Sequence, residues 1–417
     1  MRKSNGSFSI LITLAVILLA ALALSGCQAL APYNEAHAET EAPIVMQSEE
    51  VAVPVEEIAD EEMAEPQPEV TSSDDATDAN EVSLAPAGST VWAKEYIQPE
   101  SMAEVAMAES VTEETAAQDD APALATASAS AKLTNQPGRA IVSARGNHFI
   151  VDSVPPIEGP NEEINPLDMI LGAQATCALF IAERVGQEEA IPLQDIRVAV
   201  EADLDVSGVA GSGADPRLQA MRVHLELPGA DDDQIASIVS NFTSRCPVYT
   251  TLSRATDIEI TVGDEAPSAA TEGLNTASVA AQLSNQPGRA IVSARGNHFV
   301  IDSVPPLEGP NEERNPLDLM LGSLATCGTF IFERSAQEMD VPIAGITTYV
   351  EGDLDPRGLA SQDSGINPRL QAFRVTVETE GIDEAQGAEM LEQYKQRCPI
   401  YTTLQLAAPI EVSVVTN

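Results

Sequence analysis

The alternation of apolar and polar positions predicts the same series of elements twice along the chain. In the first occurrence we expect strands at 140–144, 149–153, 196–204, 218–227, 248–252 and 258–262, with helices at 165–186 and 231–245. The order is β-β-α-β-β-α-β-β, which is typical of an α+β fold.

The first predicted helix is apolar on nearly every face. Asn165 suits the N-cap, Pro166 the first helical position and Asp168 the third. From Leu167 to Ala182 the polar residues are Asp168, Gln174 and Thr176. A helix that is apolar all round is a buried helix, so we expect it at the centre of the fold.

The repeat is close enough to define two tandem domains. Residues 133–177 and 283–327 are identical at 36 of 45 positions. We place domain 1 at 131–263, a linker at 264–282 and domain 2 at 283–417. Each copy has about 130 residues, which is enough for one hydrophobic core.

The N-terminus has the pattern of a targeting segment. Arg2 and Lys3 precede an apolar run at 10–24, and small residues lead directly to Cys27. We expect a signal peptide at 1–26. The motif resembles the lipobox of bacterial lipoproteins, which implies lipidation of Cys27 and an extracytoplasmic, membrane-anchored protein of the cell envelope. An uncleaved transmembrane helix is the alternative.

Charge narrows the possible partners. The chain has 65 acidic and 21 basic residues, a net charge of −44, which argues against nucleic-acid binding. Residues 27–130 are rich in Glu, Pro and Ala, and we expect a disordered acidic tether there. The four histidines show no zinc-ligand spacing, so no metal site is expected.

The cysteines are the candidates for chemistry. Cys177 and Cys327 lie in the middle of the apolar helices, whereas Cys246 and Cys398 each follow an arginine and precede a proline. The spacing does not say whether they meet. Three interpretations stay open: structural disulfides, buried unreactive thiols and redox-active pairs.

Two motifs together resemble a known family. Asn-Pro-Leu-Asp opens a helix that reaches Ala-Thr-Cys, and Arg-Cys-Pro-(Val/Ile)-Tyr follows later, as in the OsmC/Ohr superfamily of bacterial thiol-dependent peroxidases. The resemblance covers both copies. It implies antiparallel sheets wrapped around long buried central helices, in an intimate dimer with sites at the interface. Linked copies would then pair with each other as an intramolecular pseudo-dimer.

The same resemblance implies roles for the cysteines. Cys177 and Cys327 would be peroxidatic, and Cys246 and Cys398 would be resolving. Organic hydroperoxides would be the substrates, and the cycle would run through a sulfenic acid and a disulfide. An external dithiol would serve as reductant, with no bound cofactor.

A thiolate in mid-helix needs a nearby cation. In the family the activating arginine comes from the N-terminal hairpin, which leaves two candidate pairs: Arg139 with Arg289, and Arg145 with Arg295.

One departure concerns the acid that orients this arginine. The organic hydroperoxide branch has a glutamate directly after Asn-Pro, whereas Leu167 and Leu317 stand there in this chain. Asp168 and Asp318 follow one residue later, either as orienting acids or as helix caps. The departure fits the broader OsmC-like group and keeps an alternative open: a non-catalytic binding or scaffold module of the cell envelope with structural disulfides.

Overall fold

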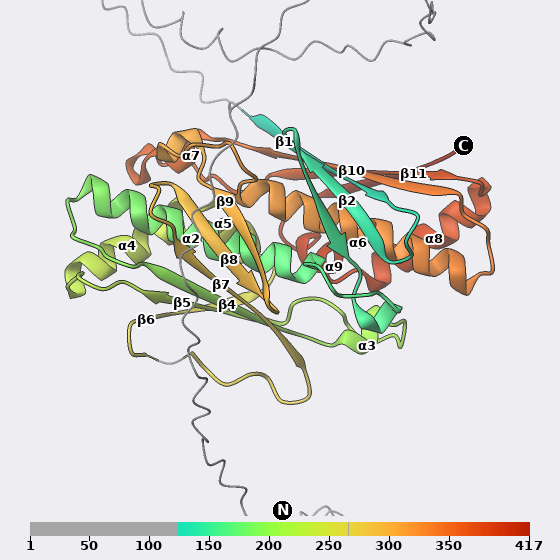
Figure 1. The fold of residues 1–417 in the computed structure, drawn as a ribbon, viewed down its shortest axis with the longest axis horizontal. Helices are drawn as coiled ribbons and strands as arrows, with labels where there is room; N and C mark the ends of the chain where they lie inside the picture. The colour runs from blue at the N-terminus through green and yellow to red at the C-terminus, as the bar shows by residue number, and fades with distance from the viewer. Residues whose placement is uncertain (1–123, 266) are drawn as a thin grey trace, which may run out of the picture. The chain divides into compact units, whose positions relative to one another are not determined.

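The computed structural model describes residues 124–417 except residue 266. The expected signal peptide at 1–26, the lipidation site Cys27 and the tether up to residue 123 lie outside the described residues. Two six-stranded sheets and two long helices organise the described part (Figure 1).

Each sheet combines the first three strands of one copy with the last three of the other. One sheet has the order β12-β11-β10-β1-β2-β3, with bounds Ile410–Thr416, Ala372–Glu380, Gly345–Leu354, Ala125–Leu133, Arg139–Ala144 and Asn147–Asp152. The other has the order β6-β5-β4-β7-β8-β9, with bounds Asp257–Val262, Ala220–Glu226, Arg197–Leu204, Asn275–Leu283, Arg289–Ala294 and Asn297–Asp302.

The copies meet where β1 pairs with β10 and β4 pairs with β7, both antiparallel. The first junction runs from the Ala125–Leu354 pair to the Lys132–Thr347 pair. Because main-chain hydrogen bonds cross between the copies in both sheets, neither copy has a complete sheet of its own. The expected pseudo-dimer within one chain is therefore confirmed.

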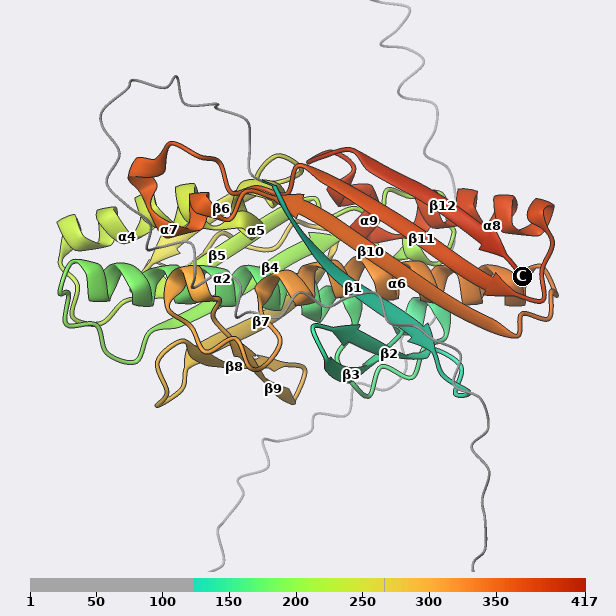
Figure 2. The same cartoon turned by 90° about the horizontal axis from the view of Figure 1, so that it is seen from above.

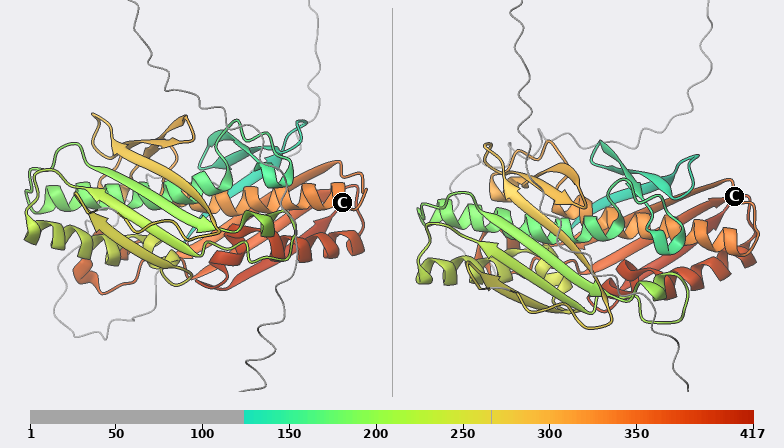
Figure 3. Two further views of the ribbon diagram at one scale, coloured as in Figure 1. Left: turned by 90° about the horizontal axis from the view of Figure 1, so that it is seen from below. Right: turned by 60° about the horizontal axis from the view of Figure 1, so that its bottom comes forward.

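The long helices lie between the two sheets (Figure 1). α2 (Pro166–Glu188) packs on β4 and β7, and α6 (Pro316–Glu338) packs on β1 and β10 (Figure 2). α4 (Asp232–Arg245) lies beside α2, and α8 (Glu384–Arg397) beside α6, as the two views in Figure 3 also show. This arrangement confirms the α+β fold around buried central helices. The sheets are not purely antiparallel as expected, because β11 pairs with β12 and β5 with β6 in parallel.

The two central helices touch each other directly. A Cβ atom on Gly322 would lie 2.7 Å from the terminal methyl of Met169 in α2, so glycine permits the close approach. α2 is long and apolar enough to cross a membrane, but 89% of its most apolar stretch is buried inside the protein. It is therefore the core helix that its all-round apolar pattern predicts.

The strand prediction at 248–252 is wrong. Those residues belong to helix α5 (Pro247–Leu252), whose counterpart is α9 (Pro399–Leu404). Their β-branched residues favour a strand in isolation. The helix forms because proline occupies its first position and the hydroxyls of Thr250 and Thr251 donate hydrogen bonds to main-chain carbonyls one turn earlier.

Two strands are missing from the prediction. β1 begins at Ala125, inside the expected tether, and β7 begins at Asn275, inside the expected linker. Both strands are rich in Ala, Ser and Thr, a composition that resembles a spacer. They are strands because each pairs on one side with a strand of the other copy, β10 or β4, and on the other side with the next strand of its own copy. Each copy therefore has the main order β-β-β-α-β-β-α-β.

A buried carboxylate ties the end of α6 to the other copy. Glu333 is 7% exposed and accepts hydrogen bonds from the main-chain N–H of Gly138 at 3.0 and 3.2 Å. Gly138 lies in the turn between β1 and β2 with φ +70°. Glu183 makes the equivalent contact with Gly288. Burial raises the pKa of Glu333 to about 7 and raises the pKa of Glu183.

This shift predicts a pH dependence of stability. An unfolded glutamate has a pKa of about 4.3, so the folded chain binds the proton more tightly. The contribution is fully present below that value and is lost as the pH rises through about 7. Between pH 5 and 8 the free energy of unfolding of the parent chain should fall by about 1–3 kcal/mol as Glu333 ionises. Glu333→Gln should abolish this fall, because glutamine does not titrate.

Urea unfolding at a series of pH values measures the effect. Glu312→Gln, which alters an exposed carboxylate paired with Arg289, is the control and should leave the profile parallel to that of the parent chain. A Glu333→Gln profile parallel to the parent would show that the carboxyl is not buried as described.

Candidate active site

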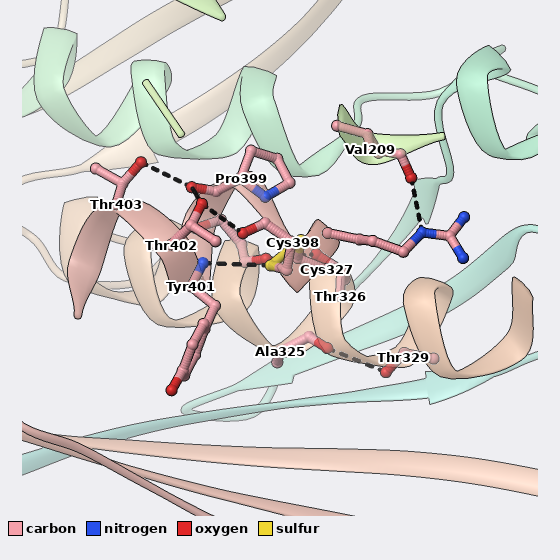
Figure 4. Close-up of a disulfide and its surroundings, with 12 residues drawn as sticks. Val209, Ala325, Thr326, Cys327, Thr329, Cys398, Pro399, Tyr401, Thr402 and Thr403 are labelled. Carbon is pink, nitrogen blue, oxygen red and sulfur yellow. Dashed lines mark hydrogen bonds between the residues drawn. A yellow bond between two sulfur atoms is a disulfide. The ribbon is translucent and has the colours of Figure 1, made fainter. Parts of the chain in front are cut away.

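Each copy contains one disulfide that joins a central helix to the start of a short helix. Cys177 in α2 is bonded to Cys246 before α5. Cys327 in α6 is bonded to Cys398 before α9, as Figure 4 shows. The Cα–Cα distances are 6.0 and 5.9 Å. The structure thus brings together the cysteines whose meeting the sequence left open.

The two sulfurs of each disulfide differ in access. Cys177 and Cys327 are each 5% exposed, whereas Cys246 and Cys398 are fully buried. A molecule from solvent therefore reaches the helix cysteine first. The buried sulfur of Cys398 accepts a hydrogen bond from the main-chain N–H of Tyr401 at 3.2 Å.

The hairpin arginine Arg295 reaches across to the other copy. It lies at the tip of the β8–β9 turn with φ 49°, a left-handed conformation that non-glycine residues adopt rarely. Its guanidinium donates to Asp168 at 2.6 and 3.0 Å and to the main-chain carbonyls of Asn161 and Glu163 at 2.9 and 2.6 Å. Arg145 binds Asp318 in the same way.

Asp168 performs two tasks at the first turn of α2. It accepts a hydrogen bond from the main-chain N–H of Asn165, whose side chain caps the helix in return. It also holds Arg295. The two interpretations of this aspartate, helix cap and arginine partner, are thus both satisfied by one carboxylate.

The other arginine candidates have a different location. Arg139 binds Asp152 at 2.6 Å on the neighbouring strand and Glu162 at 2.9 Å in the following loop, and Arg289 binds Asp302 and Glu312. Burial raises the pKa of Asp152, but hydrogen bonds from Arg139 and from main-chain N–H groups bring it below the usual value. These arginines hold the hairpin to its loop.

A cavity connects the parts of one site. It measures about 260 Å³ and is lined by residues of both copies, among them Cys327, Arg295, Asp168, Val209, Phe330 and Pro399. Most of its wall is apolar, and its polar groups include Arg295 and Asp168. The arrangement can therefore hold an apolar molecule against a wall that contains both a cysteine and a cation.

The sequence prediction missed a function of the arginine before each Cys-Pro. Arg397 is buried, binds Glu338 at 2.6 Å at the end of α6 and donates to the carbonyl of Val209 at 3.0 Å. Val209, labelled in Figure 4, ends the four-residue helix α3 (Val206–Val209), and both Val206 and Val209 line the cavity. The recurrence of Arg-Cys-Pro in both copies was the available signal, but it does not reveal a partner in the other copy.

The comparisons agree with this architecture. The family model described as OsmC-like protein matches residues 159–261 and 309–413, one stretch in each copy. The chain is therefore a tandem OsmC-like protein, and the expected family is confirmed. Comparison with curated protein sequences gave no match.

Several solved structures are similar to part of the chain. An OsmC-like protein from Mycoplasma pneumoniae is 19% identical with a TM-score of 0.28, over 33% of this chain and 94% of that one. An organic hydroperoxide resistance protein from Elizabethkingia anophelis is 15% identical with a TM-score of 0.29, over 35% and 100%. One from Legionella pneumophila is 17% identical with a TM-score of 0.27, over 32% and 94%.

The double task of Asp168 predicts a measurable cost of its removal. Asp168→Ala deletes a helix cap and leaves the guanidinium of Arg295 without its carboxylate partner. We expect the free energy of unfolding to fall by about 1–3 kcal/mol. Glu162→Ala, which breaks an exposed ion pair with Arg139, should cost under about 1 kcal/mol.

Chemical denaturation of both variants at neutral pH makes the comparison. Equal losses would contradict the dual role of Asp168.

Proposed function

We propose that this chain is a thiol peroxidase that reduces organic hydroperoxides. The observation that carries the proposal is that a helix cysteine with a buried disulfide partner and a hairpin arginine line the same apolar cavity. The relation to OsmC and Ohr proteins supports a role in peroxide resistance. The proposed peroxidatic residues are Cys177 and Cys327, and the proposed resolving residues are Cys246 and Cys398.

The reaction starts from the reduced pair. The thiolate of Cys327 attacks the distal oxygen of the hydroperoxide, the O–O bond breaks, and the alkoxide takes a proton and leaves as an alcohol. The thiolate is then a sulfenic acid. The sulfur of Cys398 attacks it, a disulfide forms and water leaves. A small external dithiol reduces the disulfide and becomes a disulfide itself.

Arg295 supplies the positive charge for this step. A nearby cation favours the thiolate and stabilises negative charge on the departing oxygen. Asp168 and the two main-chain carbonyls orient the guanidinium, so Asp168 is a positioning residue. Arg145 and Asp318 have the corresponding functions at the other site. Arg139 and Arg289 form ion pairs with Asp152 and Asp302 and therefore have a structural function.

Peroxide consumption tests the proposal. The pre-reduced chain should remove about one equivalent of tert-butyl hydroperoxide per cysteine pair, and more when a dithiol is supplied. Cys177→Ser combined with Cys327→Ser should abolish the reaction, because no sulfur then reaches the peroxide. Cys27→Ser is the matched cysteine control and should retain it.

The scaffold alternative gives a different result. Disulfides that resist dihydrolipoamide, or that hydroperoxide does not restore after reduction, would reject the peroxidase and favour a binding module with structural disulfides. A rate equal to that of the double variant would do the same.

We further propose that the protein acts outside the cytoplasm, anchored by lipid on Cys27. Support comes from the signal-like segment that ends at this cysteine. Cells fed an alkyne-tagged fatty acid should produce a labelled full-length chain in the membrane fraction, and Cys27→Ala should lose both the label and the membrane location. Unchanged labelling of Cys27→Ala would reject the anchor.

A further inference from the structure

The two sites of this chain differ in size although their cysteines, arginines and acids correspond. The cavity at Cys327 measures about 260 Å³, whereas the cavity at Cys177 measures about 20 Å³. A cavity needs a volume of roughly 10–15 Å³ to hold one water molecule. The Cys177 cavity thus has room for little more than one water molecule.

The stretch that repeats almost unchanged does not explain this difference. Corresponding loops line both cavities: Val154 to Ile157 and Asn165 to Asp168 at Cys327, and Ser303, Val304, Leu307, Pro316 and Leu317 at Cys177. These loops lie within the near-identical part of the copies. The wall at Cys327 also includes Leu204 and residues 275–278 of β7, which have no counterpart in the wall at Cys177, so the difference lies in this strand segment and in the segments that cover the cavities.

The covering helices are α3 over Cys327 and α7 (Arg357–Ala360) over Cys177. Val209 of α3 and Leu359 of α7 occupy equivalent positions, because each offers its carbonyl at 3.0 Å to the arginine before a Cys-Pro, Arg397 or Arg245. Each side chain lines its own cavity. Leucine carries one more methylene than valine, so the cover over Cys177 extends further inward.

The cover over Cys177 is also fixed more firmly to its neighbours. Arg245 donates to the carbonyl of Leu359 and, at 3.0 Å, to that of Ala360, and Gln362 donates to Ser240 at 2.9 Å. Arg397 donates to Val209 and directs its terminal nitrogens to Glu338, as Arg245 does to Glu188, but its hydrogen bonds include none equivalent to that between Arg245 and Ala360. Arg245 and Ser240 of α4 thus make three hydrogen bonds with α7 and the neighbouring Gln362, whereas Arg397 of α8 makes one with α3.

We infer that the two halves have different substrates. The Cys327–Cys398 half reduces hydroperoxides that carry a bulky apolar group, and the Cys177–Cys246 half excludes them and admits only small peroxides. Leu359 and Val209 are the specificity-determining residues. The inference rests on the proposed peroxidase function. The reaction is the same in both halves: two thiols and a hydroperoxide give a disulfide, an alcohol and water, and a dithiol restores the thiols.

Two single-site proteins test the inference. Cys177→Ser with Cys246→Ser leaves the Cys327 half, and Cys327→Ser with Cys398→Ser leaves the Cys177 half. After reduction, stopped-flow mixing with cumene hydroperoxide or hydrogen peroxide gives a rate ratio for each half. We expect the ratio of the Cys327 half to be at least about ten-fold higher, since one methylene in a pocket is worth roughly 10–200-fold.

Reciprocal exchanges of the covers make the test specific. In the Cys327 half, Val209→Leu should lower the cumene to hydrogen peroxide ratio roughly ten-fold. In the Cys177 half, Leu359→Val should raise it. Should either exchange impair folding, seen by circular dichroism, the ratios of the two single-site proteins decide alone.

The possible failures are distinct. Equal ratios in both halves, or ratios that do not respond to the exchanges, would overturn the inference and leave the peroxidase intact. No reaction of either half with either peroxide would reject the proposed function, and the inference with it.

Discussion

Antiparallel pairing of strands from different copies is the constraint on which the rest of the structure depends. β7 completes the sheet of β4, and β1 completes the sheet of β10. This exchange carries the β8–β9 hairpin across the molecule, so that Arg295 meets Asp168 on the opposite central helix. Each candidate site is consequently an interface, and the cysteine, the cation and the acid are positioned by main-chain hydrogen bonds of shared sheets.

Burial of the central helices follows from the same exchange. Each sheet is wide enough to cover one long helix, and the helices pack on each other where glycine lets them approach. Burial near the C-terminal ends of these helices raises the pKa values of Glu333 and Glu183, whose carboxylates accept hydrogen bonds from main-chain N–H groups of the other copy. Polar contacts at the ends of the helices thus reinforce the pairing that the strands begin.

The sequence predicted the parts of the fold whose signals are local. The capping box at Asn165 and the all-round apolar pattern identified α2, and the family resemblance together with the tandem repeat predicted the pseudo-dimer. Signals that depend on the other copy were not readable: β1 and β7 became strands through partners distant in sequence. The choice of Arg145 and Arg295 over Arg139 and Arg289 needed coordinates, because all four recur in the same hairpins.

Covalent linkage of the copies has an evolutionary consequence. In a homodimer one gene encodes both sites, and every substitution appears in each of them. In this chain α3 and α7 are encoded separately, so Val209 and Leu359 can change independently while the shared sheets keep both candidate sites assembled. Because the copies are linked in one chain, the two candidate sites need not stay identical, and selection can change each of them separately.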